Sequence, residues 1–175
     1  MRNLTTWGLR GLGLLVAALA VGQSLARSEH TTDSTAPPSE TKEMQLFSPG
    51  EIQWRKGPDS LPPGAQIVIL DGDPAKDGPF VFRVKVPDGY TIPPHTHPKA
   101  ERVTVISGTF NIAMTDRVDK TKGQAMTVGT FGYWPAGMKH FAWVSGDTVL
   151  QFHGNGPWQI NYLNPADDPR LAKKP

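Results

Sequence analysis

Three histidines and a glutamate stand at fixed distances from glycine and proline residues in the middle of this chain. Residues 89–108 follow the pattern G-x5-H-x-H-x3-E-x6-G, and residues 129–140 follow G-x5-P-x-G-x2-H. Side chains two positions apart on an extended segment lie on one face, about 7 Å apart, so His95 and His97 can reach the same ion. The two blocks therefore predict extended segments that carry the polar side chains and are bounded by turns.

The side chains in these blocks are typical ligands of a divalent metal. The predicted ligands are His95, His97, Glu101 and His140. Imidazole and carboxylate suit Fe, Mn, Ni, Zn, Co or Cu, so the ligand types leave the metal unidentified. Such a set leaves coordination positions open, which distinguishes a reactive site from a structural one. A purely structural ion, or a site that has lost its metal, is the alternative.

The two blocks together resemble the two-part signature of the cupin superfamily, in particular small single-domain bacterial cupins of type 2. The resemblance rests on Gly89, His95, His97, Glu101, Gly108, Gly129, Pro135, Gly137 and His140. It departs at Val144, where the family often has an asparagine that is not a ligand. The resemblance implies an all-β domain, the double-stranded β-helix or jelly roll, with the metal inside the barrel near its mouth.

Composition and periodicity independently favour an all-β fold. The chain has 18 Gly and 17 Pro in 175 residues, which punctuate many short strands. Within one predicted strand, residues 80–86, the side chains of Phe80, Phe82, Val84 and Val86 share a face. A hairpin is predicted to turn at Ser107 and Gly108. The strands are predicted at 66–71, 80–86, 101–107, 109–114, 131–134, 140–145, 148–153 and 158–163.

The first 26 residues have the features of a secretion signal. Arg2 and Arg10 come before an uncharged apolar run at 12–21. Ser24 and Ala26 are small residues at the positions that a signal peptidase requires, so cleavage is predicted after Ala26. An uncleaved membrane anchor is the alternative. Beyond this point, the sequence predicts a flexible linker at 27–43, one cupin domain at 44–170 and a polar tail at 171–175. The predicted location is the periplasm or the medium.

The charge and the cysteine content of the chain limit the kinds of partner that it is expected to bind. Removing the signal takes two arginines from the 18 Lys and Arg, which leaves 16 against 16 Asp and Glu and a net charge of zero. A neutral chain predicts no attraction to nucleic acid, and no membrane contact after cleavage. The chain has no cysteine, which excludes a lipoprotein anchor and disulfides. A small-molecule ligand or substrate is expected, and the resemblance implies a homodimer formed through sheet edges.

Two classes of function fit the site. The first is a metal-dependent oxidoreductase of dioxygenase type that acts on a small organic substrate, and the second is a non-catalytic cupin that binds a metal or small ligand. Gln151 and His153 share a strand face and are candidate acid–base groups if that face looks into the barrel. A structural role at the strand end is the alternative for His153, and Arg83 is either solvated or a clamp for a substrate carboxylate.

Overall fold

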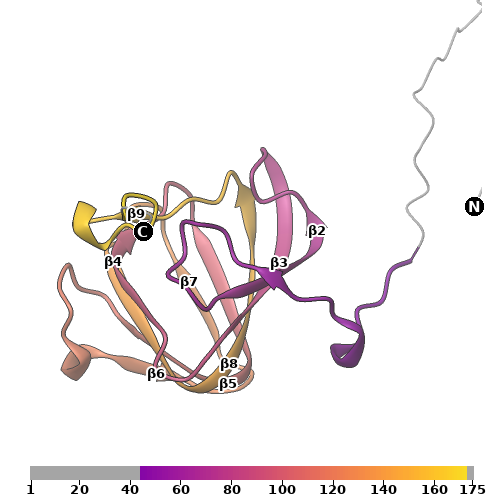
Figure 1. Cartoon of the computed structure of the whole chain (residues 1–175), viewed down its shortest axis with the longest axis horizontal. Coiled ribbons are helices and arrows are strands. Elements are labelled where there is room, and N and C mark those ends of the chain that lie inside the picture. The colour runs from indigo at the N-terminus through magenta and orange to yellow at the C-terminus, as the bar shows by residue number, and fades with distance from the viewer. Residues whose placement is uncertain (1–43, 173–175) are drawn as a thin grey trace, which may run out of the picture. The chain divides into compact units, whose positions relative to one another are not determined.

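The structure is a computed structural model that describes residues 44–172 (Figure 1). The predicted signal at 1–26 and linker at 27–43 lie outside these residues, as does the end of the chain at 173–175. Within the described part, no helix is both long and apolar enough to cross a membrane.

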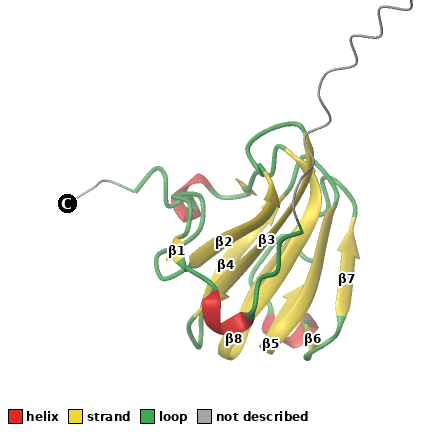
Figure 2. Ribbon diagram, turned by 90° about the vertical axis from the view of Figure 1, so that its right-hand side faces the viewer, coloured by secondary structure: helices red, strands yellow, loops and turns green. Residues whose placement is uncertain are grey.

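The described residues form a barrel of antiparallel strands with three short 3-10 helices (Figure 2). The elements are η1 (Pro49–Glu51), β1 (Arg55–Lys56), β2 (Gln66–Gly72), β3 (Gly78–Val86), β4 (Thr91–Thr96), β5 (Glu101–Ala113), η2 (Lys120–Lys122), β6 (Gln124–Met126), β7 (Phe131–Trp134), β8 (His140–Gly156), β9 (Asn161–Tyr162) and η3 (Pro165–Asp167). The predicted all-β class is confirmed.

Strand β8 connects the two parts of the barrel. Its C-terminal half pairs with β3, its N-terminal half pairs with β4, and β5 pairs with it over most of its length. The strand order is β1-β2-β3-β8-β4-β9, while β5 pairs with β8, β6 and β7. Because one long strand belongs to both groups of neighbours, the sheet closes around a single core.

The predicted hairpin at Ser107 and Gly108 was wrong, because β5 continues through both residues to Ala113. Gly108 has φ of +76°, and the register with β8 shifts on either side of Ser107, so this glycine makes a bulge in a continuous strand. The predicted break at 145–148 is likewise part of β8, in which Gly146 has φ of +76°. Bulges bend the long strands and thereby help to close the barrel.

Several short or proline-containing strands differ from the prediction. Strand β4 was not among the predicted strands, because its sequence contains two prolines, which are typical of strand edges and bulges. The two- and three-residue strands β1 and β6 were missed as well. The strand predicted at 158–163 is reduced to β9.

Alternating apolar side chains fill the inside of the barrel. Phe80, Phe82, Val84 and Val86 of β3 are all buried, as the period-two pattern predicts. The ring of Phe82 stacks between those of Phe80 and Phe152, at centroid distances of 5.3 and 5.1 Å. An interior cavity of about 20 Å³ remains, lined by apolar and aromatic residues. That volume is close to the space of one water molecule, so the core is closely packed.

The C-terminal segment folds back against the strand that carries His95. Strand β9 pairs with β4 and places Tyr162 opposite His95. Ile160 is buried, and its carbonyl accepts a hydrogen bond of 2.9 Å from the Arg170 guanidinium. The Tyr162 hydroxyl donates to the carbonyl of Ser60 at 2.7 Å. These bonds fix residues 158–162 beside the histidines.

We expect Gly108→Ala to destabilise the barrel more than Gly129→Ala. Both glycines have positive φ, and an L-residue there costs about 1–2 kcal/mol. A methyl group at Gly108 would also overlap the Thr148 hydroxyl and the Asp147 carbonyl, whereas nothing lies near one at Gly129. Overpacking adds about 1–3 kcal/mol. Equal shifts of the urea midpoint for the two variants would contradict this account of the β5 bulge.

Candidate metal centre

Three strands and one turn bring the predicted ligands together. Strand β4 carries His95, and its pairing with β8 places His95 directly opposite His140, the first residue of β8. His97 follows the end of β4, and its carbonyl accepts a 2.8 Å hydrogen bond from the backbone N–H of Gly137. The turn before β8 is therefore tied to the chain at His97. Glu101 enters from the start of β5.

The three histidines form a compact buried cluster. Their side chains are 2–4% exposed, and one ligand nitrogen from each lies within 4.8 Å of the other two. The ring centroid of His95 lies 4.2 Å from that of His140 and 4.9 Å from that of His97. Three imidazoles so close together are a candidate site for one metal ion.

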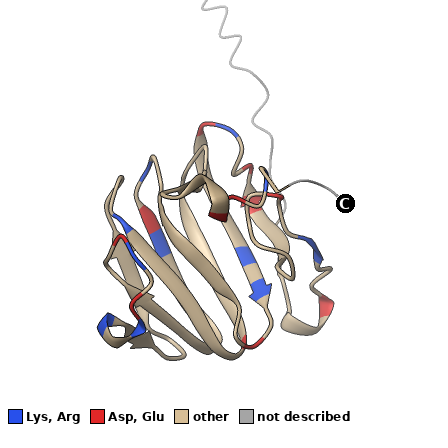
Figure 3. Cartoon of the chain, turned by 60° about the vertical axis from the view of Figure 1, so that its left-hand side comes forward, with Lys and Arg blue, Asp and Glu red and all other residues tan. Residues whose placement is uncertain are grey.

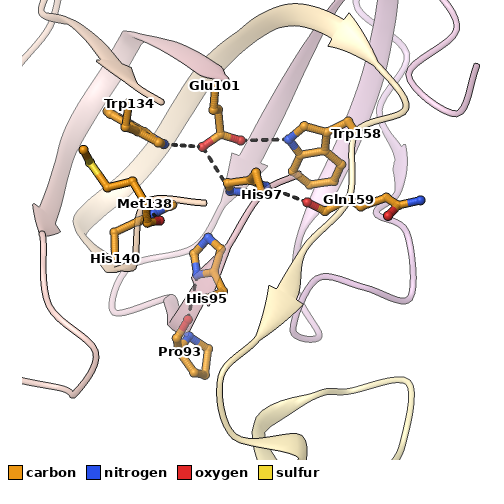
Figure 4. Close-up of polar contacts among 9 residues, drawn as sticks. All are labelled: Pro93, His95, His97, Glu101, Trp134, Met138, His140, Trp158 and Gln159. Atoms are coloured by element: carbon orange, nitrogen blue, oxygen red, sulfur yellow. Dashed lines mark hydrogen bonds and ion pairs between the residues drawn. The ribbon is translucent and has the colours of Figure 1, made fainter. Parts of the chain in front are cut away.

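Each histidine is oriented by a hydrogen bond from its Nδ1 to a backbone carbonyl (Figure 4). A carbonyl only accepts, so Nδ1 carries the hydrogen, and the Nε2 of a neutral ring carries a free lone pair. Orientation of metal-binding histidines by such a bond is usual. The pairs are His95 with Pro93 at 2.7 Å, His97 with Gln159 at 2.7 Å, and His140 with Met138 at 2.9 Å.

One buried nitrogen of the cluster has no hydrogen-bond partner among the described residues. It is Nε2 of His97, which lies 3.3 Å from Oε2 of Glu101. With His97 neutral, a lone pair of nitrogen faces a lone pair of oxygen, an arrangement that is unfavourable away from water. Either a proton on Nε2, which the raised pKa of His97 favours, or a metal cation at this position removes the conflict. The donor set and this unsatisfied atom both fit a divalent metal.

Glu101 stands beside the histidine cluster, held by two tryptophans. Its Oε2 accepts a 2.8 Å hydrogen bond from Nε1 of Trp134, and its Oε1 accepts a 2.7 Å bond from Nε1 of Trp158. The carboxylate is not part of the group whose ligand atoms lie within 4.8 Å of one another. The structure thus brings Glu101 to His97 without placing it in the same ligand group.

The buried charges of the site fix its protonation. Burial raises the pKa of Glu101, but the neighbouring His97 and His140 and the hydrogen bonds outweigh burial and lower that pKa to about 2. Burial, with the nearby His140 and His97, lowers the pKa of His95 to about 3. Burial also lowers the pKa of His140. For His97, burial is outweighed by the adjacent Glu101, and the pKa is raised.

Gln151 and His153 do not join the cluster. The buried Leu150 and Phe152 alternate with them on β8, so both candidates lie on the outer face of the barrel. The Oε1 of Gln151 accepts a 3.0 Å hydrogen bond from Nε of Arg83. Their assignment as acid–base groups at the metal is therefore not supported by the geometry.

Two aromatic contacts involve His153 and Arg102 on the outer face. The His153 ring stacks against Phe131 at a centroid distance of 6.0 Å. Arg102, which follows Glu101 on β5, points away from the histidines, as strand alternation predicts, and its guanidinium lies 5.1 Å from the centre of the Tyr133 ring.

Comparison with known families decides the identity of the fold. The model of the ChrR cupin-like domain family matches residues 42–159, more than half of the chain. The chain belongs to this cupin family. The cupin resemblance inferred from the two sequence blocks is thereby confirmed.

The cupin has partial sequence similarity to plant germin-like proteins. It is 33% identical over 72 residues to germin-like protein 5-1 of Oryza sativa subsp. japonica, covering 41% of this chain and 33% of that protein. It is 32% identical over 89 residues to germin-like protein subfamily 2 member 1 of Arabidopsis thaliana, covering 50% and 40%. The match thus spans between a third and two fifths of the length of these relatives.

Solved structures support the jelly-roll fold of the cupin. The polyketide cyclase RemF from Streptomyces resistomycificus has a TM-score of 0.55 and 16% identity, covering 73% of this chain and 90% of that one. An acetylacetone dioxygenase from Acinetobacter johnsonii has a TM-score of 0.54 and 14% identity, covering 73% and 81%. At such low identity these likenesses show the fold alone.

The metal-free protein should lose stability as the pH falls from 6.5 towards 3. His95 is neutral in the folded protein down to a pKa of about 3 but becomes protonated near pH 6.5 when unfolded. Unfolding then takes up a proton, which lowers the free energy of unfolding by about 1.4 kcal/mol per pH unit. His140 acts in the same direction. The pKa of His97 is raised in the folded protein, so protonated His97 stabilises the fold below pH 6.5. That stabilisation is lost only as the pH rises above 6.5, so it does not change the trend between pH 6.5 and 3.

Urea titrations at several pH values measure this slope. The His95→Gln variant is the control, because it removes the group whose pKa is most lowered and should flatten the dependence between pH 6.5 and 3. An equally steep dependence in the variant would show that His95 is not buried in its neutral form.

Proposed function

We propose that this protein binds one divalent transition-metal ion through Nε2 of His95, His97 and His140. The observation that carries the proposal is that all three rings donate Nδ1–H to backbone carbonyls and so present their free nitrogens inside one buried cluster. Glu101, which is ionised because its pKa is about 2, supplies the negative charge of the site. The metal is one of Fe, Mn, Ni, Zn, Co or Cu.

We further propose that the protein is a metal-dependent enzyme of dioxygenase type acting on a small organic substrate. When bound, the ion supplies Lewis acidity and, in the case of iron, activation of oxygen. The chain's own residues hold the three nitrogens, keep Glu101 charged and pack the rings of Trp158 and Trp134 against His97 and His140. An acetylacetone dioxygenase shares this fold, and the proposal takes its reaction type from that fold-level analogy.

A non-catalytic role is the second candidate, and a specific observation favours it. The barrel interior is filled by apolar side chains around a cavity of about 20 Å³. The polar groups proposed for proton transfer, Gln151 and His153, lie on the outer face with Arg83. In this alternative the protein holds a metal or a small ligand without turning over a substrate.

We also propose that the protein acts in the periplasm or outside the cell. The support is the sequence of residues 1–26, with cleavage after Ala26, and the neutral chain of 16 basic and 16 acidic residues that remains. In the view of Figure 3 charges of both signs are spread over strands as well as loops. The metal would then be loaded after export, where Zn and Cu compete strongly. An uncleaved membrane anchor is the alternative to cleavage after Ala26, and a homodimer is a further expectation for the protein.

His95→Ala and His140→Ala should each abolish stoichiometric metal uptake while the barrel stays folded, because each removes one of three converging nitrogens. The metal content after anaerobic reconstitution and gel filtration measures this, with circular dichroism as the check on folding. His153→Ala is the matched control, since it removes a histidine from the outer face. Unchanged metal content in the His95→Ala,His140→Ala double variant would rule out the proposed site.

Oxygen consumption separates the two candidate functions. The Fe(II)-loaded protein should consume oxygen with at least one member of a panel of small diketones, phenols and carboxylic acids, and His140→Ala should not. The non-catalytic alternative would be supported if panel members bind saturably to the metal-loaded protein but none of them is turned over. This comparison is made with Fe, Mn, Ni, Co, Cu or Zn bound.

A further inference from the structure

The three histidines of the candidate metal centre are closed off from the solvent. Each is 2–4% exposed, although the proposed ion and substrate must both reach them. The long strands β5 and β8, of 13 and 17 residues, form much of the barrel wall, and their hydrogen-bonded ladders hold them in place. Access to the site therefore needs a part of the wall that can open locally while the barrel stays folded.

The C-terminal segment 159–163 lies beside two of the histidines. The carbonyl of Gln159 accepts the 2.7 Å hydrogen bond from Nδ1 of His97 (Figure 4). Tyr162 lies opposite His95 in the pairing of β4 with β9, and the centroids of the two rings are 6.1 Å apart. We call residues 159–163 the strap, because this short segment borders both histidines without contributing a ligand.

The strap is attached to the barrel by a short ladder and a few further bonds. Strand β9 pairs with β4 over two residues, and the backbone N–H of Leu163 donates to the carbonyl of Pro94 at 2.9 Å. The Tyr162 hydroxyl donates to the carbonyl of Ser60 at 2.7 Å. Within the strap, only the side chain of Ile160 is buried. Segments with short ladders and few buried side chains open at a lower free-energy cost than long core strands.

Neighbouring parts of the wall are held more firmly. Trp158, which precedes the strap, donates from its backbone N–H to the carbonyl of Pro74 and from Nε1 to Glu101. The turn at 135–139 also borders the site, but it joins β7 to β8 and leads directly into His140. Opening this turn would displace a proposed ligand, whereas opening the strap leaves the segments that carry the histidines in place.

We propose that the strap is the entrance to the histidine cluster, and that the hydrogen bond from the Tyr162 hydroxyl to the Ser60 carbonyl is the latch that keeps it closed. The role in metal and substrate entry rests on the proposed metal site. When the latch breaks, β9 separates from β4, and the side of His95 that Tyr162 covers becomes accessible. The opening of the strap then limits the rate at which a ligand enters, while the closed cluster sets its affinity.

A disulfide across the strap tests this proposal, because the chain contains no cysteine of its own. Thr96 and Asn161 are directly paired in the β4–β9 register, one position along from His95 and Tyr162, so their side chains share the opposite face. Paired residues of antiparallel strands have the separation that a disulfide needs. In the Thr96→Cys,Asn161→Cys variant, the oxidised form should take up Co(II) about 10-fold or more slowly than the reduced form. Its final stoichiometry and affinity should be the same.

Gln66→Cys,Lys85→Cys is the matched control, because this directly paired couple joins β2 to β3 on the outer face of the barrel. Its oxidation should leave the rate of Co(II) uptake unchanged. Equal uptake rates for the oxidised and reduced forms of Thr96→Cys,Asn161→Cys would overturn the proposal.

Two tyrosines allow the latch to be tested by a conservative change. Tyr162 and Tyr90 each donate a 2.7 Å hydrogen bond to the loop between β1 and β2, to the carbonyls of Ser60 and Pro62 respectively. Tyr162→Phe keeps the ring but removes the latch, so Co(II) uptake should become about 2- to 10-fold faster, which corresponds to one hydrogen bond. Tyr90→Phe removes the equivalent bond outside the strap and should leave the rate unchanged. An unchanged rate in Tyr162→Phe, or an equal increase in both variants, would overturn the latch.

Histidine modification in the metal-free protein separates this proposal from the proposed function. Diethyl pyrocarbonate should modify His95 more slowly in the oxidised Thr96→Cys,Asn161→Cys variant than in the reduced one, as measured by mass spectrometry. His153, on the outer face, should react equally in both. This result, combined with no uptake of Co(II), Fe(II) or Zn(II) by the wild type, would keep the entrance and overturn the metal site. Uptake of one ion per chain at equal rates in the oxidised and reduced variant would keep the metal site and overturn the entrance.

Discussion

The pairing of β8 with its neighbours is the constraint on which the rest of the structure depends. One 17-residue strand hydrogen-bonds to β3, β4 and β5 and so fixes which residues face one another across the barrel. The β4–β8 register sets His140 opposite His95, while the other half of β8 places Leu150 and Phe152 in the core. A shift of one residue would exchange the inner and outer faces and dismantle both the core and the histidine cluster.

Burial of the histidine cluster in this core is tolerated because its three Nδ1 atoms and the Glu101 carboxylate have hydrogen-bond partners, which leaves the three Nε2 atoms for a ligand. Backbone carbonyls accept from every Nδ1, and two indoles donate to Glu101. Nε2 of His97 is the one buried side-chain atom without a hydrogen-bond partner in the described chain. Isolated unsatisfied atoms in otherwise complete networks are typical of positions that a proton or a ligand occupies. The unsatisfied atom therefore marks the centre of the proposed function.

Much of the fold and part of the site could be predicted from the sequence. The all-β class, the buried face of β3 and the approach of His95, His97 and His140 follow from local spacing, glycine and proline. Gly108 was misinterpreted because a glycine with positive φ serves a turn and a bulge equally well, and only the partner strand distinguishes them.

The remaining differences depend on contacts between distant residues. Alternation shows that Gln151 and His153 share a face, but the register with β3 and β5 decides that this face is the outer one. Trp134 and Trp158 are 24 positions apart in sequence, so their convergence on Glu101 leaves no local pattern. Local spacing in the sequence was thus enough to identify the histidines, whereas the residues that surround them could be identified only from the three-dimensional fold.

The most direct test of the central claim is X-ray absorption spectroscopy at the edge of the bound metal. Three imidazole nitrogens at about 2.0–2.1 Å from the metal are expected, together with oxygen ligands. A shell with fewer than three imidazoles, or one made of oxygen alone, would contradict the convergence of His95, His97 and His140 on a single ion.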